Sequence, residues 1–486
     1  MSKELLSLEP KLVWENFYQL TRIPRPSKHE AATVKFVQEF GKKHNLETII
    51  DTGGNVILRK PATPGFENRM GIILQAHLDM VPQKNSDTKH DFEKDPIETY
   101  IDGEWVKAKG TTLGADNGIG IAAALAVLQS NDLEHGLIEA LLTIDEEAGM
   151  TGAKNIQAGV LKGNILLNLD SEDEGELYVG CAGGSDATAV FKYEETSVPA
   201  NSLAYELALT GLKGGHSGLD INLGRGNANK IMFRFLKKVV ANHGVRLSTI
   251  LGGSLRNAIP REAFATITVP KNEEKDFLNT LKKFTETVKS ELGKTEPDLN
   301  FVAKKVELPK FVMDEISQDD LINAIKACPN GVMRMSADME NLVETSLNLA
   351  IVKSKDKKVE INALIRSSVD SAKESVESTL ESLFRLAGAE IRFSGQYPGW
   401  KPNMDSPILK TMQNVYQNKW GKVPEIRAIH AGLECGILGA VYPSWDMISF
   451  GPTIRFPHSP DEKVNIKSVG LFWEYLVETL KNVPEK

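Results

Sequence analysis

The sequence has few cysteines, no excess of basic residues and no long apolar run. Its three cysteines, Cys181, Cys328 and Cys435, are far apart and form no CxxC pair, which excludes a disulfide framework and indicates a reducing compartment. A net charge of −8 leaves no basic face for phosphate groups, so neither nucleic acid nor a membrane surface is an expected partner. No stretch of about 18 apolar residues could span a bilayer, and the N-terminus lacks the apolar segment of a signal peptide. We therefore expect a cytoplasmic protein.

At 486 residues the chain is too long for one hydrophobic core, so at least two domains are expected. Strand-like and helix-like segments alternate between residues 47 and 170, which is typical of an α/β domain with a mixed, largely parallel sheet. From about residue 185 two successive sets of strands and helices approach a β-α-β-β-α-β order. The sequence predicts a first domain of residues 1–185 and 396–486, and an inserted α+β domain of two such lobes at 186–395. Ser27 is expected to cap a helix over 28–44.

The most informative stretch is the apolar strand predicted at 71–79, which ends in His77-x-Asp79. Residues two apart on a strand share one face, so the imidazole and the carboxylate leave the strand side by side. They do so at the carboxyl end, where open α/β sheets place their sites. A single His-x-Asp pair is more often a surface ion pair or a hydrogen-bonded histidine, so further residues are needed to decide.

Four more candidate ligands stand where predicted strands or loops end: Asp116, Glu147, Asp170 and His458. Alone, Asp116 could be a helix N-cap and Asp170 part of a solvated acidic loop. Together with His77 they supply two imidazoles and three carboxylates without a thiolate, a set that suits zinc and tolerates manganese or cobalt. Three carboxylates exceed the needs of one structural zinc and suit two cations that share a bridging carboxylate.

Glu146 and Glu147 are adjacent acids at the end of an apolar strand. If Glu147 binds a metal, Glu146 stays free to act as the general base toward a water molecule held by the cations. Asp79 is expected to hydrogen-bond the second nitrogen of His77 and to fix its tautomer.

Several blocks carry a resemblance to a known family: 74–83 around His77, 111–120 around Asp116, Asp145-Glu-Glu-Ala-Gly149, Gly214-Gly-His-Ser-Gly218, Arg256-Asn-Ala-Ile-Pro-Arg261, His430-Ala-Gly-Leu-Glu-Cys-Gly436 and Pro457-His-Ser-Pro460. At these residues the sequence resembles the dinuclear-zinc peptidase superfamily that includes carnosinases and aminoacylases. The resemblance implies two Zn2+ per chain, with Mn2+ or Co2+ as substitutes. His77 and Asp170 would hold one ion, Glu147 and His458 the other, and Asp116 would bridge them.

The resemblance also assigns roles in the inserted domain, which serves as a lid in this family. His216 would reach the substrate carbonyl, Asn257 and Arg366 would hold the substrate backbone and its free carboxylate, and Gly432 would supply a backbone contact. Because the lid here is doubled, the resemblance leaves open a homodimer, and whether His216 acts in its own chain or across an interface.

The implied activity is hydrolysis of unblocked dipeptides of broad specificity, including Xaa-His and β-alanyl-histidine, by a metal-bound hydroxide with Glu146 as general base. The alternative on the same scaffold is an N-acyl amino-acid amidohydrolase. A metal-stabilised binding protein without catalysis is the third hypothesis, but such a protein would not need Asp79, Glu146 and His216.

Overall fold

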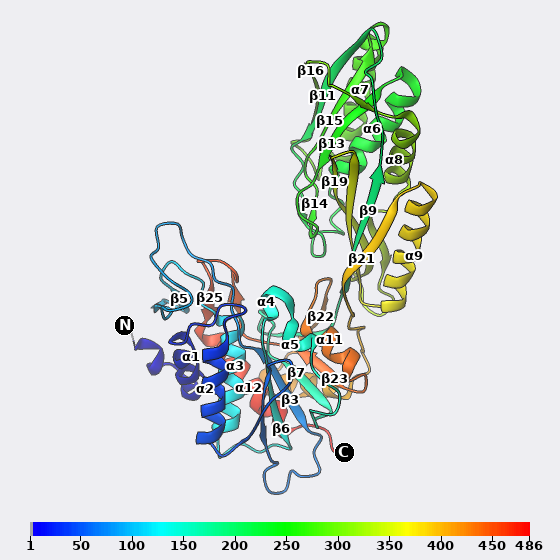
Figure 1. Cartoon of the computed structure of the whole chain (residues 1–486). Coiled ribbons are helices and arrows are strands. Elements are labelled where there is room, and N and C mark those ends of the chain that lie inside the picture. The colour runs from blue at the N-terminus through cyan, green and yellow to red at the C-terminus, as the bar shows by residue number, and fades with distance from the viewer. Residues whose placement is uncertain (1–2) are drawn as a thin grey trace. The chain divides into compact units, whose positions relative to one another are not determined.

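The computed structural model describes residues 3–486 and divides into two compact units (Figure 1). Unit 1 comprises Met1–Cys181, Pro402–Ala428 and Leu433–Lys486, and unit 2 comprises Ala182–Lys401 and Ile429–Gly432. The chain therefore leaves unit 1 and returns to it twice. None of the helices within residues 3–486 is long and apolar enough to cross a membrane.

The main sheet of unit 1 has eight strands, with β3 (Ile72–His77) near its centre. All six residues of β3 are buried, and β3 runs parallel to both of its neighbours. The carboxyl ends of the neighbouring parallel strands therefore meet at one edge of the sheet. The order is β1 (Glu47–Ile50), β2 (Val56–Lys60), β6 (Ile138–Thr143), β3, β7 (Ile165–Asn168), β23 (Asp446–Ser449), β8 (Glu176–Cys181) and β22 (Glu425–Ile429).

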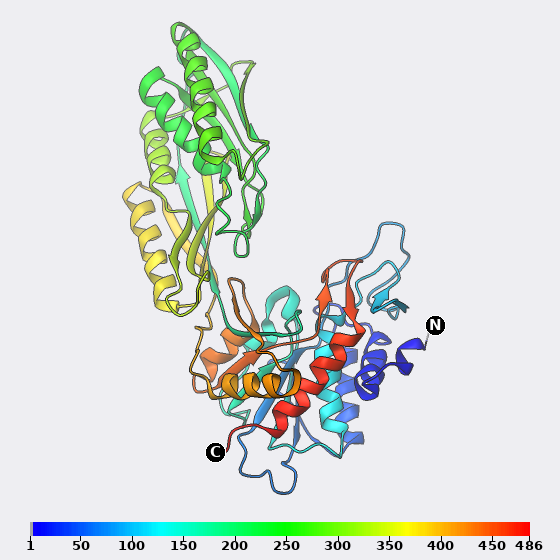
Figure 2. The same ribbon diagram turned by 180° about the vertical axis from the view of Figure 1, so that it is seen from behind.

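Helix α3 (Ala115–Gln129) is the central helix of unit 1. Its residues from Asn117 to Leu128 are all buried, because it packs against β3, α1 (Lys11–Thr21) and α12 (Ile466–Lys481); Figure 2 shows α12 beside it. The remaining α-helices of unit 1 are α2 (Ala31–Lys43), α4 (Glu146–Gly149), α5 (Thr151–Lys154), α10 (Pro407–Trp420) and α11 (Glu434–Val441). A smaller sheet has the order β24 (Ile454–Arg455), β25 (Lys463–Asn465), β5 (Trp105–Ala108) and β4 (Thr99–Asp102).

The expected cap of the second helix is wrong. Helix α2 begins at Ala31 and its N-cap, Glu30, makes no side-chain capping bond. The Ser27 hydroxyl instead donates a hydrogen bond to Asp79 at 2.8 Å. In the sequence, a short polar side chain just before a helix looks the same whether it caps that helix or bonds to a distant carboxylate.

Unit 2 is built from two β-α-β-β-α-β lobes that share one sheet. The inserted lobe consists of β11 (Ser202–Thr210), α6 (Ala228–His243), β13 (Arg246–Gly252), β15 (Ala263–Pro270), α7 (Glu274–Leu292) and β16 (Asn300–Val306). The host lobe consists of β9 (Gly183–Lys192), α8 (Glu315–Ala327), β19 (Val343–Lys355), β20 (Lys358–Ser367), α9 (Asp370–Leu386) and β21 (Glu390–Tyr397). The predicted pair of lobes is confirmed, but β9, the first strand of the host lobe, precedes the whole inserted lobe.

The strand order shows how the lobes join. It runs β16-β11-β15-β13 and continues as β19-β20-β9-β21, so each lobe follows the same order and they meet edge to edge at β13 and β19. The chain enters and leaves the inserted lobe through a two-stranded ribbon of β10 (Glu195–Thr196) and β17 (Val312–Met313). A second ribbon, β12 (Gly215–His216) with β14 (Ala258–Ile259), and β18 (Gly331–Met335), which pairs with β19, complete the strands.

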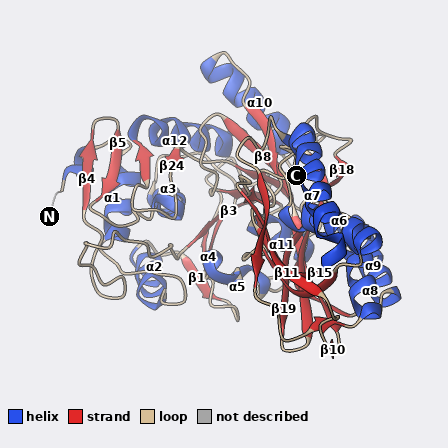
Figure 3. Cartoon of the chain, turned by 90° about the horizontal axis from the view of Figure 1, so that it is seen from above, coloured by secondary structure: helices blue, strands red, loops and turns tan. Residues whose placement is uncertain are grey.

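The four helices of unit 2 pack on one face of this sheet (Figure 3), and one continuous apolar core lies beneath them. Its centre is aromatic. The ring of Phe235 lies 6.1 Å from that of Phe277, 5.2 Å from Phe284 and 5.1 Å from Phe301, measured between centroids. Phe235 is fully buried, so removing its ring would leave a cavity among the neighbouring rings.

We expect Phe235→Ala to lower the free energy of unfolding by about 3–5 kcal/mol, because truncation leaves a cavity among rings that cannot collapse together. Chemical denaturation followed by circular dichroism measures the change. Leu386→Ala is the control, since Leu386 is 90% exposed and its truncation should change stability by less than about 0.5 kcal/mol. Equal effects of the two substitutions would contradict this account of the core.

Candidate metal centre

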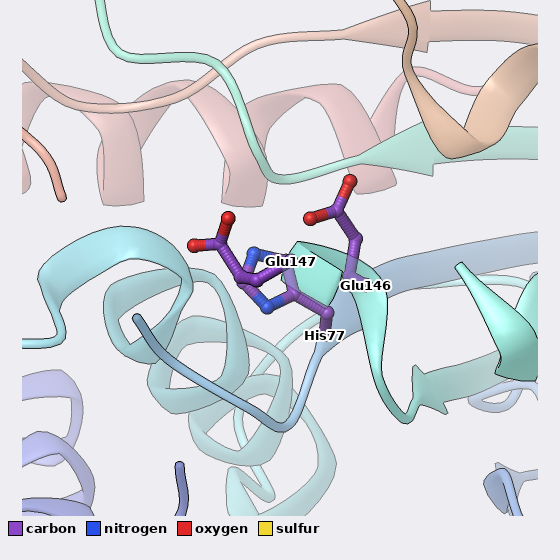
Figure 4. A group of neighbouring side chains, drawn as sticks. All are labelled: His77, Glu146 and Glu147. Carbon is purple, nitrogen blue, oxygen red and sulfur yellow. The ribbon is translucent and has the colours of Figure 1, made fainter. Parts of the chain in front are cut away.

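The five predicted ligands of unit 1 meet at the carboxyl ends of its parallel strands. His77 is the last residue of β3, Glu147 lies in α4 just after β6, and Asp170 follows β7. Asp116 lies in the first turn of α3 with non-helical backbone angles, and His458 lies in the loop between β24 and β25 with φ of 57°. Figure 4 shows His77 with Glu146 and Glu147, whose carboxylates extend to the same side of the imidazole.

The ligand atoms form two groups that share Asp116. In the first, Nε2 of His77 lies 3.2 Å from Oδ1 of Asp116 and 3.3 Å from Oδ1 of Asp170. In the second, Nε2 of His458 lies 3.2 Å from Oδ2 of Asp116 and 3.0 Å from Oε2 of Glu147. Asp116 therefore presents one oxygen to each group and does not act as a helix N-cap, since Gly114 occupies that position without a side-chain bond.

These separations fit ligands arranged around cations. Two ligand atoms of a tetrahedral site with bonds of about 2.1 Å are about 3.4 Å apart, close to the 3.0–3.3 Å found here. Within each group all ligand atoms lie within 4.8 Å of one another. Nitrogen and carboxylate donors without a thiolate suit a divalent cation of intermediate softness. The residues present therefore fit a divalent metal centre, and Asp116 belongs to both of its ligand groups.

Asp79 holds both His77 and the start of α4. Its Oδ1 lies 3.3 Å from Nδ1 of His77, so the imidazole directs Nε2 toward the ligand groups. The same carboxylate accepts hydrogen bonds from the backbone N–H groups of Glu146 and Glu147 at 3.0 and 3.1 Å. Although burial opposes it, the bonds from His77, Ser27 and the α4 backbone lower the pKa of Asp79 to about 2. Asp79 is thus a fixed negative charge behind the site.

Glu146 lies beside the centre but outside both Asp116 groups. It joins only the cluster with His77 and Glu147. Burial, and then the negative charges of nearby carboxylates, raise its pKa well above the usual value for a glutamate. Such a group is suited to accept a proton and release it again.

Glu462, which sequence reasoning missed, fixes the backbone around Asp116. Its buried carboxylate accepts four hydrogen bonds of 2.7–3.2 Å from consecutive backbone N–H groups, those of residues 113–116. Arg25, also missed, donates to the carbonyls of Leu78 and Asp79 at 3.0 and 2.7 Å. The only sequence signals were an acid shortly after His458 and an arginine between two prolines.

A third missed residue, Glu434, ties together the strands that carry the ligands. Its Oε2 accepts from Gln75 of β3 at 2.6 Å and from Thr143 of β6 at 2.7 Å. Asn168 of β7 donates in turn to Gln75. The network crosses β6, β3 and β7 directly beneath the ends that lead to Glu147, His77 and Asp170. Polar residues inside apolar strands were the available signal.

Without cations the centre binds protons strongly. Hydrogen bonds to Asp116 and Glu147 raise the pKa of His458 to about 11. Burial lowers the pKa of His77, but Asp170, Asp116 and Asp79 outweigh it and hold that pKa well above its usual value. Burial raises the pKa of Asp170 to about 6. Without cations, the neighbouring carboxylates therefore favour the protonated form of both imidazoles.

Unit 2 brings its predicted residues into a separate cluster. Nδ1 of His216 accepts from the backbone N–H groups of Gly218 and Leu219 at 3.2 and 3.0 Å, so the proton of the neutral ring is on Nε2. Burial, followed by the charge of Arg366, lowers the pKa of His216 and favours this neutral form. The ring therefore offers an N–H donor at Nε2.

Arg366 is the centre of that cluster. Its guanidinium lies 3.5 Å from the hydroxyl of Ser217 and 3.3 Å from that of Tyr397, and it is 6% exposed. The backbone carbonyl of Asn257 accepts from Ser217 at 2.8 Å, and a Cβ added at Gly432 would meet the Tyr397 ring at 3.1 Å. Four predicted residues, His216, Asn257, Arg366 and Gly432, thus surround Ser217 and Tyr397.

A family model for peptidase family M20/M25/M40 matches residues 73–482, so the chain belongs to this peptidase family. Cytosol non-specific dipeptidase of Escherichia coli (strain K12) is 49% identical over 483 residues, covering 99% of this chain and 100% of that protein. The crystal structure of aminoacylhistidine dipeptidase from Vibrio alginolyticus matches with a TM-score of 0.96 at 52% identity, covering 100% of this chain and 99% of that one. Aminopeptidase PepT from Bacillus cereus ATCC 10987 shares the fold, with a TM-score of 0.57, 16% identity, and coverage of 98% and 99%. These findings confirm the predicted family and α/β fold class.

Loading the protein with a divalent cation should release at least two protons per chain at pH 7.5. The pKa of His458 is about 11 and that of His77 is also raised, whereas a cation binds only the neutral imidazole nitrogen. Calorimetric titration in buffers of different ionisation enthalpy measures the release. His458→Ala should release about one proton fewer, and the absence of any release from the unaltered protein would contradict the assignment.

Proposed function

We propose that this chain hydrolyses unblocked dipeptides, with broad specificity that includes Xaa-His and β-alanyl-histidine, and that it uses two Zn2+ ions. The full-length similarity to two dipeptidases supports the substrate class. The single observation that carries the mechanism is Glu146, a carboxylate beside two ligand groups yet outside the pair that shares Asp116. A purely structural metal site would have no use for such a neighbour.

In this proposal His77, Asp170 and Asp116 hold one ion, and Asp116, Glu147 and His458 the other, while Mn2+ or Co2+ could replace Zn2+. Such ions, when bound, polarise the peptide carbonyl and acidify a nearby water molecule. Glu146 takes the proton from the attacking water and delivers it to the nitrogen of the departing amino acid. Asp79 keeps His77 in the required tautomer throughout.

Residues of unit 2 would bind the rest of the substrate. His216 donates from Nε2 to the carbonyl oxygen as negative charge develops there, which stabilises the transition state. Arg366 binds the free carboxylate in a bidentate manner, with Asn257 and the backbone of Gly432 holding the peptide. His216 would act either within its own chain or across a homodimer.

The proposal extends to domains and location. Residues 1–185 and 396–486 act as the metal-binding domain and 186–395 as the lid, and the protein works in the cytoplasm. The alternative, an N-acyl amino-acid amidohydrolase, is not favoured because the two full-length relatives are dipeptidases. Comparing free dipeptides with N-acetylated amino acids separates the two activities.

Glu146→Gln should lower kcat by about 10²–10⁴-fold, because the amide cannot accept a proton from water. Metal content, measured by atomic emission after dialysis, should stay at the level of the unaltered protein. Retention of more than about a tenth of the activity would remove Glu146 from the role of general base.

His216→Ala should lower kcat by about 10²–10³-fold, the usual effect of removing one donor to a developing oxyanion, with unchanged metal content. His243→Ala is a matched control in the same unit, because the ring nitrogens of His243 contact Glu273 and Thr280. An equal loss in both variants would indicate a folding effect and refute the assigned role.

A further inference from the structure

The second ligand group depends on a loop more than the first group does. His77 and Asp170 stand at the ends of buried strands, whereas His458 lies on the loop between β24 and β25, and its side chain is 52% exposed. Phe456 and His458 both have left-handed backbone angles, with φ of 56° and 57°. Such angles are unfavourable for residues that carry a side chain, and they persist only where the surroundings enforce them. Contacts around the loop must therefore hold this histidine in place.

Hydrogen bonds anchor both ends of the loop. At its start, the guanidinium of Arg455 donates to the carbonyl of Glu172 at 3.0 Å. At its end, Glu462 accepts the backbone N–H groups of residues 113–116. Between these anchors, in the part of the chain that the structure describes, the backbone of residues 456–458 forms no hydrogen bond with another protein group. The middle of the loop is therefore held by side chains.

Lys463 lies between two aromatic rings at this loop. Its ammonium nitrogen is 4.4 Å from the ring centroid of Trp105 and 5.6 Å from that of Phe456. Both distances lie within the limit of about 6 Å for cation–π attraction. Lys463 therefore links β5 to the first residue of the loop.

The register of the smaller sheet explains this arrangement. Lys463 of β25 is directly opposite Lys107 of β5, and Trp105 lies two residues before Lys107 on the same face; Figure 1 shows β5 beside β25. Phe456 follows Arg455, which is the partner of Lys463 in β24. A continuing strand would direct the Phe456 ring to the opposite face. Its left-handed angle ends the strand, and the ring contacts Lys463 instead.

We propose that Lys463 is a positioning residue for His458. By binding the Phe456 ring, it keeps the loop in its present conformation, in which Nε2 of His458 lies 3.2 Å from Asp116 and 3.0 Å from Glu147. A ligand that is already in place loses less conformational freedom when a cation binds, so this ligand group binds its cation more tightly. The inference rests on the metal centre of the proposed function and names the residue that prepares its exposed histidine.

The test is equilibrium dialysis of the full chain against a series of Zn2+ concentrations buffered by a chelator. Lys463→Met keeps most of the length of the side chain and removes its charge, so it should raise the dissociation constant of one of the two Zn2+ ions by about 3–30-fold. Lys463→Arg keeps a cation between the rings and should stay within about twofold of the unaltered protein. Lys107→Met is the matched control and should leave both ions unaffected, because Lys107 pairs with Asp102 at 3.0 Å.

A double-mutant cycle separates positioning from a general effect on the fold. In the His458→Ala background the loop no longer carries a ligand, so Lys463→Met should cause no further change in Zn2+ affinity. A loss by the same factor in both backgrounds would show a structural role and overturn the inference. The unfolding midpoint of each variant, measured by circular dichroism, reports whether the fold is intact.

Should Lys463→Met fail to fold, Phe456→Leu serves instead, because it removes the ring from a side chain that is 59% exposed and retains its apolar character. It should raise the same dissociation constant by about 3–10-fold. Unchanged Zn2+ affinity in the folded variant, or an equal loss in Lys463→Arg, overturns the inference. Absence of alanyl-histidine hydrolysis by the unaltered protein with both Zn2+ ions bound would instead overturn the proposed function.

Discussion

Carboxylates gathered at the ends of β3, β6 and β7 repel one another, and the rest of unit 1 must hold them in place against this repulsion. Asp116, Glu147 and Asp170 lie within ion-pair distance of His77 or His458, and Glu146 lies close by. So many negative charges in a partly buried space require positive charge. Protonated imidazoles supply some of it, and the donor set is suited to divalent cations. The surrounding architecture serves to hold this unfavourable arrangement together.

Two buried glutamates hold the segments that carry these carboxylates. Glu462 fixes four consecutive N–H groups before and at Asp116, and Glu434 links Gln75 and Thr143 across neighbouring strands. Both are themselves buried acids, and burial raises the pKa of each to about 7. The molecule therefore positions one set of carboxylates with another, and uses backbone amides and neutral side chains as the donors.

Much of this was predictable from sequence, and the exceptions have a common cause. His77, Asp116, Glu147, Asp170 and His458 follow strand ends or interrupt loops, so short-range pattern and donor chemistry identified them. Glu462, Glu434 and Arg25 act through partners far along the chain, 346–349 residues away for Glu462, and no local pattern encodes such pairing. The two lobes were visible as repeated strand and helix patterns, but no local pattern places β9 in the host lobe, because its partners β20 and β21 lie beyond an intervening lobe.

The ribbon of β10 and β17 places the start and the end of the inserted lobe side by side. A segment whose two ends adjoin can be added to a loop, or removed from it, without stretching the remaining chain. In evolutionary terms, one duplication of a gene segment followed by one insertion is sufficient to produce unit 2 from a single-lobed ancestor. The shared strand order of the two halves, joined where β13 meets β19, is the arrangement that such a history would leave.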